Sequence, residues 1–171
     1  GIMRLFRWSL PHLPEGLVQR HALIDQLVSQ SSASIIMELA SGLSTRSWRL
    51  MSNDNHSLEG YIELDLPHVI AHKKKQLESQ PEFSFPDKLK FYARDLKELT
   101  IEELNVLLSD SEAPLIIAEG LVMYFTPDEL ISLFRKLSTV LGVRGGQLIF
   151  DWVPTVEQPT PGFFGRLLSE L

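Results

Sequence analysis

Apolar and polar positions along the chain follow two alternating patterns. Short, compact apolar runs are typical of buried strands, and they alternate with segments in which apolar residues recur at helical spacing. We predict strands near residues 34–40, 60–65, 88–94, 115–121 and 147–153, and helices over residues 17–30, 44–52, 67–79, 100–109 and 126–141. This alternation predicts an α/β fold with a mostly parallel sheet.

The last of these helices has clear start and stop signals. Thr126 is a suitable N-cap, Pro127 fits the first helical position, and Glu129 three residues after the cap completes a capping box. Gly142 and the pair Gly145-Gly146 are predicted to stop the helix.

The two ends of the chain differ from the alternating middle. Residues 1–16 mix aromatic and leucine side chains with two prolines, which indicates an entrance segment or lid, and residues 17–171 are expected to form the main domain. The stretch 154–162 contains three prolines and is predicted to be a loop, followed by a helix over 163–171. An open sheet of five strands that ends here predicts that C-terminal sequence is missing.

Composition narrows the classes of protein that fit. At 171 residues the chain fits one domain with a substantial core. A net charge of −6 without a basic stripe argues against a nucleic-acid partner, and no apolar run reaches the ~18–20 residues of a membrane span. The absence of cysteine excludes a disulfide framework and suits a cytoplasmic protein. The oligomeric state is not indicated.

The most informative stretch is Met37–Arg46, where an apolar run ends in small residues and a helix-compatible stretch follows. A turn of small residues between a strand and a helix lets the backbone pass close to a ligand. The next apolar run ends at Asp65, 23 positions after Gly42 (65 − 42). An acid at the end of the second strand is placed to accept hydrogen bonds from a ribose. Together the two features predict a ligand built on adenosine.

Other polar residues have simpler interpretations. His68 and His72 have the spacing of a metal-binding pair on a helix, but no acid or cysteine completes a site, so we expect surface histidines and no metal. The lysines at 73–75 are predicted to be a solvated stretch in the later turns of a helix. Glu119 differs, because an acid that ends an apolar run is costly if it is buried without a partner.

Four stretches of the chain resemble motifs of a known family. Residues 38–46, E-L-A-S-G-L-S-T-R, resemble E-L-G-A-G-L-D-T-R, and residues 61–67 with the lysines at 73–75 resemble E-x-D-x-P…K. Asp95-Leu96 resembles a D-L pair, and residues 117–127 resemble A-E-G-x-x-x-Y-x-x-P. Four such motifs in this order are similar to the leucine carboxyl methyltransferase family, which includes bacterial O-methyltransferases linked to polyketide biosynthesis. Ala40 and Ser44 stand where the family has glycine and aspartate.

The resemblance implies a Rossmann-like class I methyltransferase fold, with a sheet in the order 3-2-1-4-5 and helices on both faces. It also implies an S-adenosylmethionine site at the carboxyl ends of the strands. Gly42 would let the backbone approach the methionine part of this cofactor, and Asp65 would accept from the ribose hydroxyls. Asp95 would bind the adenine amino group, and the Leu96 amide would face a ring nitrogen.

The charged head of the cofactor would be held by ion pairs. The resemblance implies that Glu119 meets its α-ammonium group. Its α-carboxylate would bind an arginine, with Arg20 in the helix before the first strand as the best match and Arg46 as a second candidate. Glu38, which opens the first motif, is assigned to the same cofactor site.

The predicted activity is transfer of a methyl group to a carboxylate or hydroxyl of a small-molecule or protein acceptor. A hydroxyl acceptor needs a general base and a carboxylate does not; Tyr124, Asp151 and His12 are polar candidates near the acceptor, with nothing to rank them. One alternative is an NAD(P)-dependent oxidoreductase, although two of the three glycines of its G-x-G-x-x-G turn are replaced, by Ala40 and Thr45. A catalytically inactive cofactor-binding domain is the other alternative.

Overall fold

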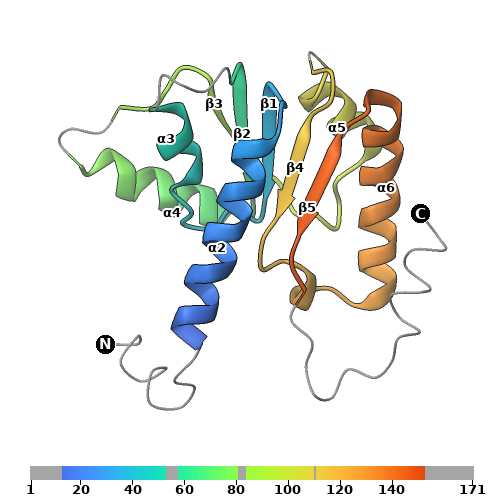
Figure 1. The fold of residues 1–171 in the computed structure, drawn as a ribbon, viewed down its shortest axis with the longest axis horizontal. Helices are drawn as coiled ribbons and strands as arrows, with labels where there is room; N and C mark the ends of the chain where they lie inside the picture. The colour runs from blue at the N-terminus through green and yellow to red at the C-terminus, as the bar shows by residue number, and fades with distance from the viewer. Residues whose placement is uncertain (1–12, 53–57, 81–83, 110, 153–171) are drawn as a thin grey trace. The chain divides into compact units, whose positions relative to one another are not determined.

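The computed structural model describes residues 13–52, 58–80, 84–109 and 111–152 (Figure 1). The chain divides into two compact units, Gly1–Ser32 and Ala33–Leu171, which are treated separately here. In the first unit, helix α2 (Leu13–Gln30) confirms the predicted helix and begins earlier than expected. Pro14 explains the difference, because proline is tolerated in the first turn of a helix. The predicted loop 154–162, the predicted helix 163–171 and most of the predicted lid lie outside the described residues.

The second unit contains a five-stranded sheet. Its strands are β1 (Ile35–Leu39), β2 (Gly60–Asp65), β3 (Leu89–Ala93), β4 (Leu115–Ala118) and β5 (Gln147–Phe150). Their order in the sheet is β3-β2-β1-β4-β5, and every pairing is parallel (Figure 1). The five predicted strands and their expected order are therefore confirmed.

Strand β4 ends earlier than the sequence predicted. It stops at Ala118, and Glu119 lies in a turn in which Gly120 has a positive φ of 66°. A short 3₁₀ helix η1 (Val122–Tyr124) follows where the strand was expected to continue. Because glycine adopts positive φ without steric cost, Gly120 allows the chain to leave the sheet at this point.

Four helices connect the strands of the second unit: α3 (Arg46–Met51), α4 (Pro67–Glu78), α5 (Ile101–Leu107) and α6 (Pro127–Arg144). The capping box of Thr126 and Glu129 is present at the start of α6, as predicted. The expectation that Gly142 stops this helix was wrong. Glycine costs only about 1 kcal/mol relative to alanine inside a helix, and the buried Val140 and Leu141 hold the last turn in place. The helix ends at Gly145 in the left-handed conformation.

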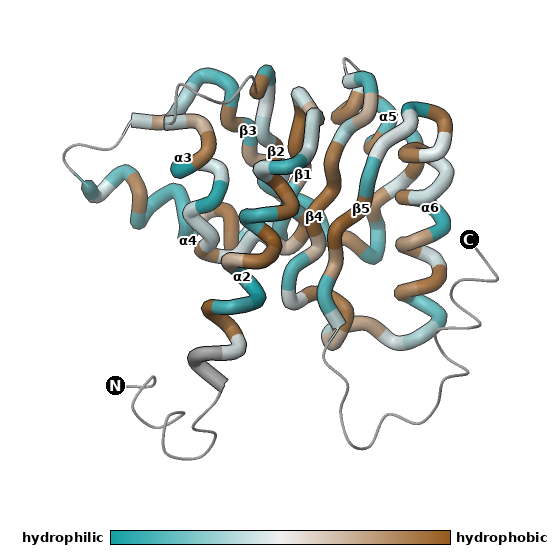
Figure 2. Tube along the Cα trace, viewed as in Figure 1, coloured by the Kyte–Doolittle hydropathy of each residue, from teal (hydrophilic) through white to brown (hydrophobic). Residues whose placement is uncertain are grey.

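The two faces of the sheet differ in chemistry. On one face, strand residues such as Met37, Leu64 and Ile116 join α5 and α6 in a continuous apolar core. The other face carries Glu38 and Glu63, which are register partners on β1 and β2 and bind side chains of α3 and α4. Helices therefore cover both faces, as expected. Figure 2 shows β4 as mostly hydrophobic and α4 as mostly hydrophilic. Among the described helices, none is long and apolar enough to cross a membrane.

Candidate functional site

The turn after β1 has an unusual backbone. Ala40 and Gly42 both have φ of 51°, in the left-handed region. The amide of Gly42 donates to Oδ2 of Asp65 over 2.7 Å, and the amide of Leu66 donates to Oδ1 of the same carboxylate, also over 2.7 Å. A Cβ at Gly42 would meet nothing nearer than the carbonyl oxygen of Ala40 at 4.0 Å, so conformation rather than space favours glycine here. Asp65 thus ties the turn to the end of β2.

A cavity of about 480 Å³ lies at the carboxyl ends of β1, β2 and β3. This volume is within the range of ~300–1,000 Å³ typical of small-molecule sites. Its wall combines the turn after β1, two strand-end acids and two cations with apolar and aromatic side chains: Ala40, Gly42, Asp65, Leu66, Val69, Arg94, Asp95, Leu96, Lys97, Leu121, Tyr124 and Phe125. Such a wall offers acceptors for hydroxyl or amino groups and apolar surface for a flat ring.

The loop after β3 presents Asp95 and Leu96 to this cavity. Oδ1 of Asp95 accepts from the amide of Lys97 over 2.9 Å, and the buried side chain of Leu96 anchors the loop in the apolar core. Lys97 extends to the start of α6, where its ammonium lies 2.8 Å from Glu129 and 5.7 Å from the centre of the Phe125 ring. One wall of the cavity is therefore linked to the capping box of α6.

A buried ionic cluster joins the ends of β1 and β4. Arg46 has a fully buried guanidinium that donates to Glu38 over 2.5 Å and to Glu119 over 2.6 Å. The hydroxyl of Tyr61 donates to the second oxygen of Glu38 over 2.7 Å. Burial raises the pKa of Glu38, although the guanidinium of Arg46 opposes this, and burial beside Glu38 raises the pKa of Tyr61 well above its ordinary value. The cluster holds two carboxylates around one guanidinium.

The structure places the expected site residues in three different parts of the fold. The cavity described above is lined by Gly42, Asp65, Asp95 and Leu96. The ionic cluster is formed by Glu38, Arg46 and Glu119. Arg20 lies on α2 in the first unit. What each residue does toward a ligand stays a prediction.

The three polar residues considered for an acceptor also differ in place. Tyr124 lines the cavity and is largely exposed, and Asp151 accepts from the amide of Gly120, which joins the end of β5 to the turn after β4. His12 lies outside the described residues.

Comparison with known proteins identifies the family. The model of the family described as leucine carboxyl methyltransferase matches residues 4–138. This match covers well over half of the chain. The chain belongs to the leucine carboxyl methyltransferase family. No curated protein sequence matches it significantly.

Solved structures agree with this family in fold. The mitomycin 7-O-methyltransferase MmcR matches with a TM-score of 0.51 and 14% identity, over 94% of this chain and 47% of its own. A structure titled as a pericyclic reaction enzyme matches with a TM-score of 0.50 and 11% identity, over 80% of this chain and 32% of its own. The chain thus spans a third to a half of the length of these structures. Its sheet order is that of the Rossmann-like class I methyltransferase fold.

The two departures from the family motif have visible consequences. Ala40, in place of the family's first glycine, still adopts a positive φ, which costs an alanine about 1–2 kcal/mol. Ser44, in place of the family's aspartate, accepts from the amide of Arg46 over 3.2 Å. The Ser44 hydroxyl thus satisfies the first amide of α3 from the position before the N-cap, Thr45, whose own side chain makes no capping hydrogen bond.

Sequence analysis missed a second buried ion pair. Lys73 was expected to be solvated, but its side chain is buried and pairs with the fully buried Glu63 of β2. The prediction was wrong for Lys73 because successive residues of a helix point in different directions: Lys73 turns toward Glu63, whereas Lys75 is exposed. Lys74 is half-buried, and its ammonium lies 5.0 Å from the centre of the Phe91 ring on β3. A signal was present, since Glu63 interrupts an apolar strand just as Glu119 follows one, and a buried acid needs a partner.

Proposed function

We propose that this protein is an S-adenosylmethionine-dependent O-methyltransferase that transfers a methyl group to a carboxylate or hydroxyl of its acceptor. The observation that supports this most is the convergence of Gly42, Asp65 and the Asp95-Leu96 pair around one cavity. These residues come from three separate motifs of the family to which the chain belongs. Fold alone does not decide the chemistry, because one similar structure is titled as a pericyclic reaction enzyme.

The nucleoside part of the cofactor fits the chemistry of the cavity wall. Each oxygen of Asp65 accepts one backbone amide and has a second lone pair free to accept from a ribose hydroxyl. Asp95 is half-buried and has an oxygen for the adenine amino group. Leu66, Val69 and Phe125 supply apolar surface for the ring.

The ionic cluster fits a cationic cofactor better than an anionic one. Glu38 and Glu119 both pair with Arg46 and place two carboxylates at the ends of β1 and β4, which suits a positive group of the cofactor. Meanwhile, the amide of Gly42 donates to Asp65 and is not available for a pyrophosphate. Both observations favour S-adenosylmethionine over NAD(P), which needs backbone amides around its phosphates.

When it is bound, S-adenosylmethionine supplies an activated methyl group on a positively charged sulfur. The chain has to hold the acceptor in line with that methyl group and to exclude water. Tyr124 lies at the cavity wall and is a candidate to orient a hydroxyl acceptor. A carboxylate acceptor would need no proton transfer.

Cofactor binding can be tested by thermal shift with S-adenosylhomocysteine, NAD and NADP. At about 100 times its dissociation constant a ligand adds ~2.7 kcal/mol, which raises the melting temperature of a chain of this size by roughly 5–10 °C. We expect a shift with S-adenosylhomocysteine alone. A shift with NAD or NADP alone, or no shift with any of the three, would contradict the proposal.

Asp95→Ala is the most informative variant for this test, with Asp87→Ala on the exposed loop before β3 as its control. We expect Asp95→Ala to reduce the shift and Asp87→Ala to preserve it. Asp65→Ala is less suitable, because Asp65 also holds the amides of Gly42 and Leu66.

Methyl transfer needs a separate measurement. The protein is incubated with methyl-tritiated S-adenosylmethionine and a panel of carboxylate and hydroxyl acceptors. A methyl ester releases volatile tritiated methanol in alkali, whereas a methyl ether does not, so the product class is read directly. Binding of S-adenosylhomocysteine without transfer to any acceptor would favour a catalytically inactive binding domain.

A further inference from the structure

Glu63 is a buried acid on β2 that the proposed cofactor contacts leave unused. It lies in the middle of β2 and is fully buried. A carboxylate in such a place is strongly destabilising unless a cation and hydrogen-bond donors compensate it. Three side chains do so: Ser41 of the turn after β1, Ser47 of α3 and Lys73 of α4. Each comes from a different segment of the chain.

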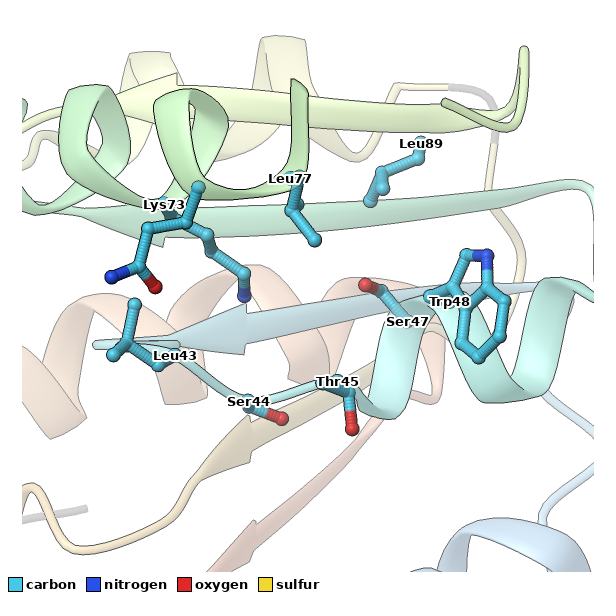
Figure 3. Close-up of a pocket in the computed structure, with 9 residues that line it drawn as sticks. Leu43, Ser44, Thr45, Ser47, Trp48, Lys73, Leu77 and Leu89 are labelled. Carbon is cyan, nitrogen blue, oxygen red and sulfur yellow. The ribbon is translucent and has the colours of Figure 1, made fainter. Parts of the chain in front are cut away.

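Lys73 extends from α4 to Glu63. Together with Ser47 of α3, it lines a pocket between the two helices. Figure 3 shows Lys73 extending from α4, and Ser47 from α3, into the space between the two helices. The Lys73 side chain is only 5% exposed. Its ammonium compensates the charge of Glu63, and an ionised carboxylate can accept from both serine hydroxyls at once.

The contact with Ser41 links this pair to the candidate site. The hydroxyl of Ser41 donates to Oε2 of Glu63 over 3.3 Å, and the amide of Ser41 donates to the carbonyl oxygen of Leu64 over 3.3 Å. The next residue, Gly42, donates to Asp65. Glu63, Leu64 and Asp65 of β2 therefore accept hydrogen bonds from Ser41 and Gly42 of the turn.

We propose that Glu63, Lys73 and Ser41 are positioning residues, which fix the turn 40–42 against β2 so that Gly42 and Asp65 face the cavity in register. None of the three lines the cavity, so their effect on a ligand passes through the turn. The inference rests on the proposed function only in its choice of ligand. It also gives a physical reason for the spacing of Glu63, Asp65 and Lys73, since Glu63 lies two residues before Asp65 on β2 and Lys73 reaches Glu63 from α4.

The two serines provide a matched test. Both donate to Glu63 and both are almost completely buried, at 4% exposed for Ser41 and 2% for Ser47, but only Ser41 belongs to the turn. We expect Ser41→Ala to weaken S-adenosylhomocysteine binding by about five- to tenfold, the effect of one hydrogen bond. We expect Ser47→Ala to change the dissociation constant less than about twofold. Equal effects of the two variants on affinity would overturn the proposal.

Hydrogen exchange of the Gly42 amide gives a readout that needs no ligand. If Ser41 positions the turn, this amide exchanges roughly tenfold faster in Ser41→Ala, because local opening becomes easier. In Ser47→Ala its rate should stay at the wild-type value. If wild-type protein failed to bind S-adenosylhomocysteine, the proposed function would fail, and this exchange measurement would still decide whether the turn is positioned by Ser41.

The role of Lys73 is tested in a double variant that leaves no unpaired buried charge. Lys73→Met alone leaves Glu63 charged and unpaired, so Lys73→Met is combined with Glu63→Gln to keep the site neutral. We expect the double variant to bind S-adenosylhomocysteine about tenfold more weakly, with faster Gly42 exchange. Lys75→Met, at an exposed position on the same helix, is the control and should match wild type. Wild-type affinity and exchange in the double variant would overturn the role of the pair.

Discussion

At the residue scale, Ala40 is a position where the sequence and the backbone conformation disagree. Its φ of 51° costs an alanine about 1–2 kcal/mol, whereas glycine loses more chain entropy on folding. Because the relief of strain exceeds the entropy cost of glycine, we predict that Ala40→Gly raises the free energy of unfolding by about 0.5–1 kcal/mol. Urea denaturation measures this change directly.

Ala113 is a matched control for that substitution. It has the same φ of 51° but lies in the loop before β4, away from the cavity. We expect Ala113→Gly to stabilise the protein to a similar extent and to leave S-adenosylhomocysteine affinity unchanged. A loss of stability in both variants would show that the left-handed conformations carry no strain.

Arg46 pairs with two acids, the buried Glu38 and the half-buried Glu119. Arg46→Met leaves Glu38 and Glu119 without their guanidinium, and breaking a buried ion pair in this way typically costs 3–5 kcal/mol. We expect a loss of about this size in urea denaturation. Arg49→Met, at an exposed position on the same helix, should stay within about 0.5 kcal/mol of wild type.

The pH dependence of that loss has a definite sign. Burial raises the pKa of Glu38 and Arg46 counteracts it, so removal of Arg46 raises this pKa further. A carboxyl whose pKa is higher in the folded state favours folding when it is protonated, and this contribution is lost as the pH rises through the folded pKa. The deficit of Arg46→Met relative to wild type should therefore be smaller at pH 5 than at pH 8. An equal deficit at both pH values would contradict the role assigned to Glu38.

At the element scale, the start of α6 is held by Glu129. Hydrogen bonds from Lys97 and from the amide of Thr126 lower the pKa of Glu129 to about 2. A depressed carboxyl pKa stabilises the fold above the ordinary value of 4.5, and this contribution is lost as the pH falls toward about 2. In Lys97→Met we expect the pKa of Glu129 to move back toward its ordinary value, as followed by NMR titration of its carboxyl carbon. Lys90→Met, on an exposed position of β3, should leave it unchanged.

Elements were predictable from sequence wherever their signals are local. The capping box at Thr126 and the apolar runs of the five strands depend on neighbouring residues, and both appear as predicted. For Lys73 the sequence showed only that the buried Glu63 needs a partner, because the choice of Lys73 depends on which side of α4 faces the sheet. The bridge from Arg46 to Glu119 spans 73 positions, so no local pattern encodes it.

At the scale of the whole molecule, the two faces of the sheet in the second unit are covered by different kinds of interaction. The face under α5 and α6 is an apolar core, which accounts for much of the buried surface. The face under α3 and α4 carries the paired acids Glu38 and Glu63 with their buried cations. Because only part of the core lines the cavity, we predict that core substitutions away from the cavity lower stability and leave ligand affinity unchanged.

Two buried leucines of the apolar core test that separation. Leu108, at the end of α5, accepts a hydrogen bond from Arg144 in the last turn of α6, whereas Leu96 lines the cavity. Both side chains are buried, so each substitution to alanine should cost about 2–5 kcal/mol of unfolding free energy. We expect Leu96→Ala alone to weaken S-adenosylhomocysteine binding, by about tenfold or more, because its loop carries Asp95. Calorimetric titration beside urea denaturation measures both quantities, and a comparable loss of affinity in Leu108→Ala would show that the core and the cavity are coupled through the sheet.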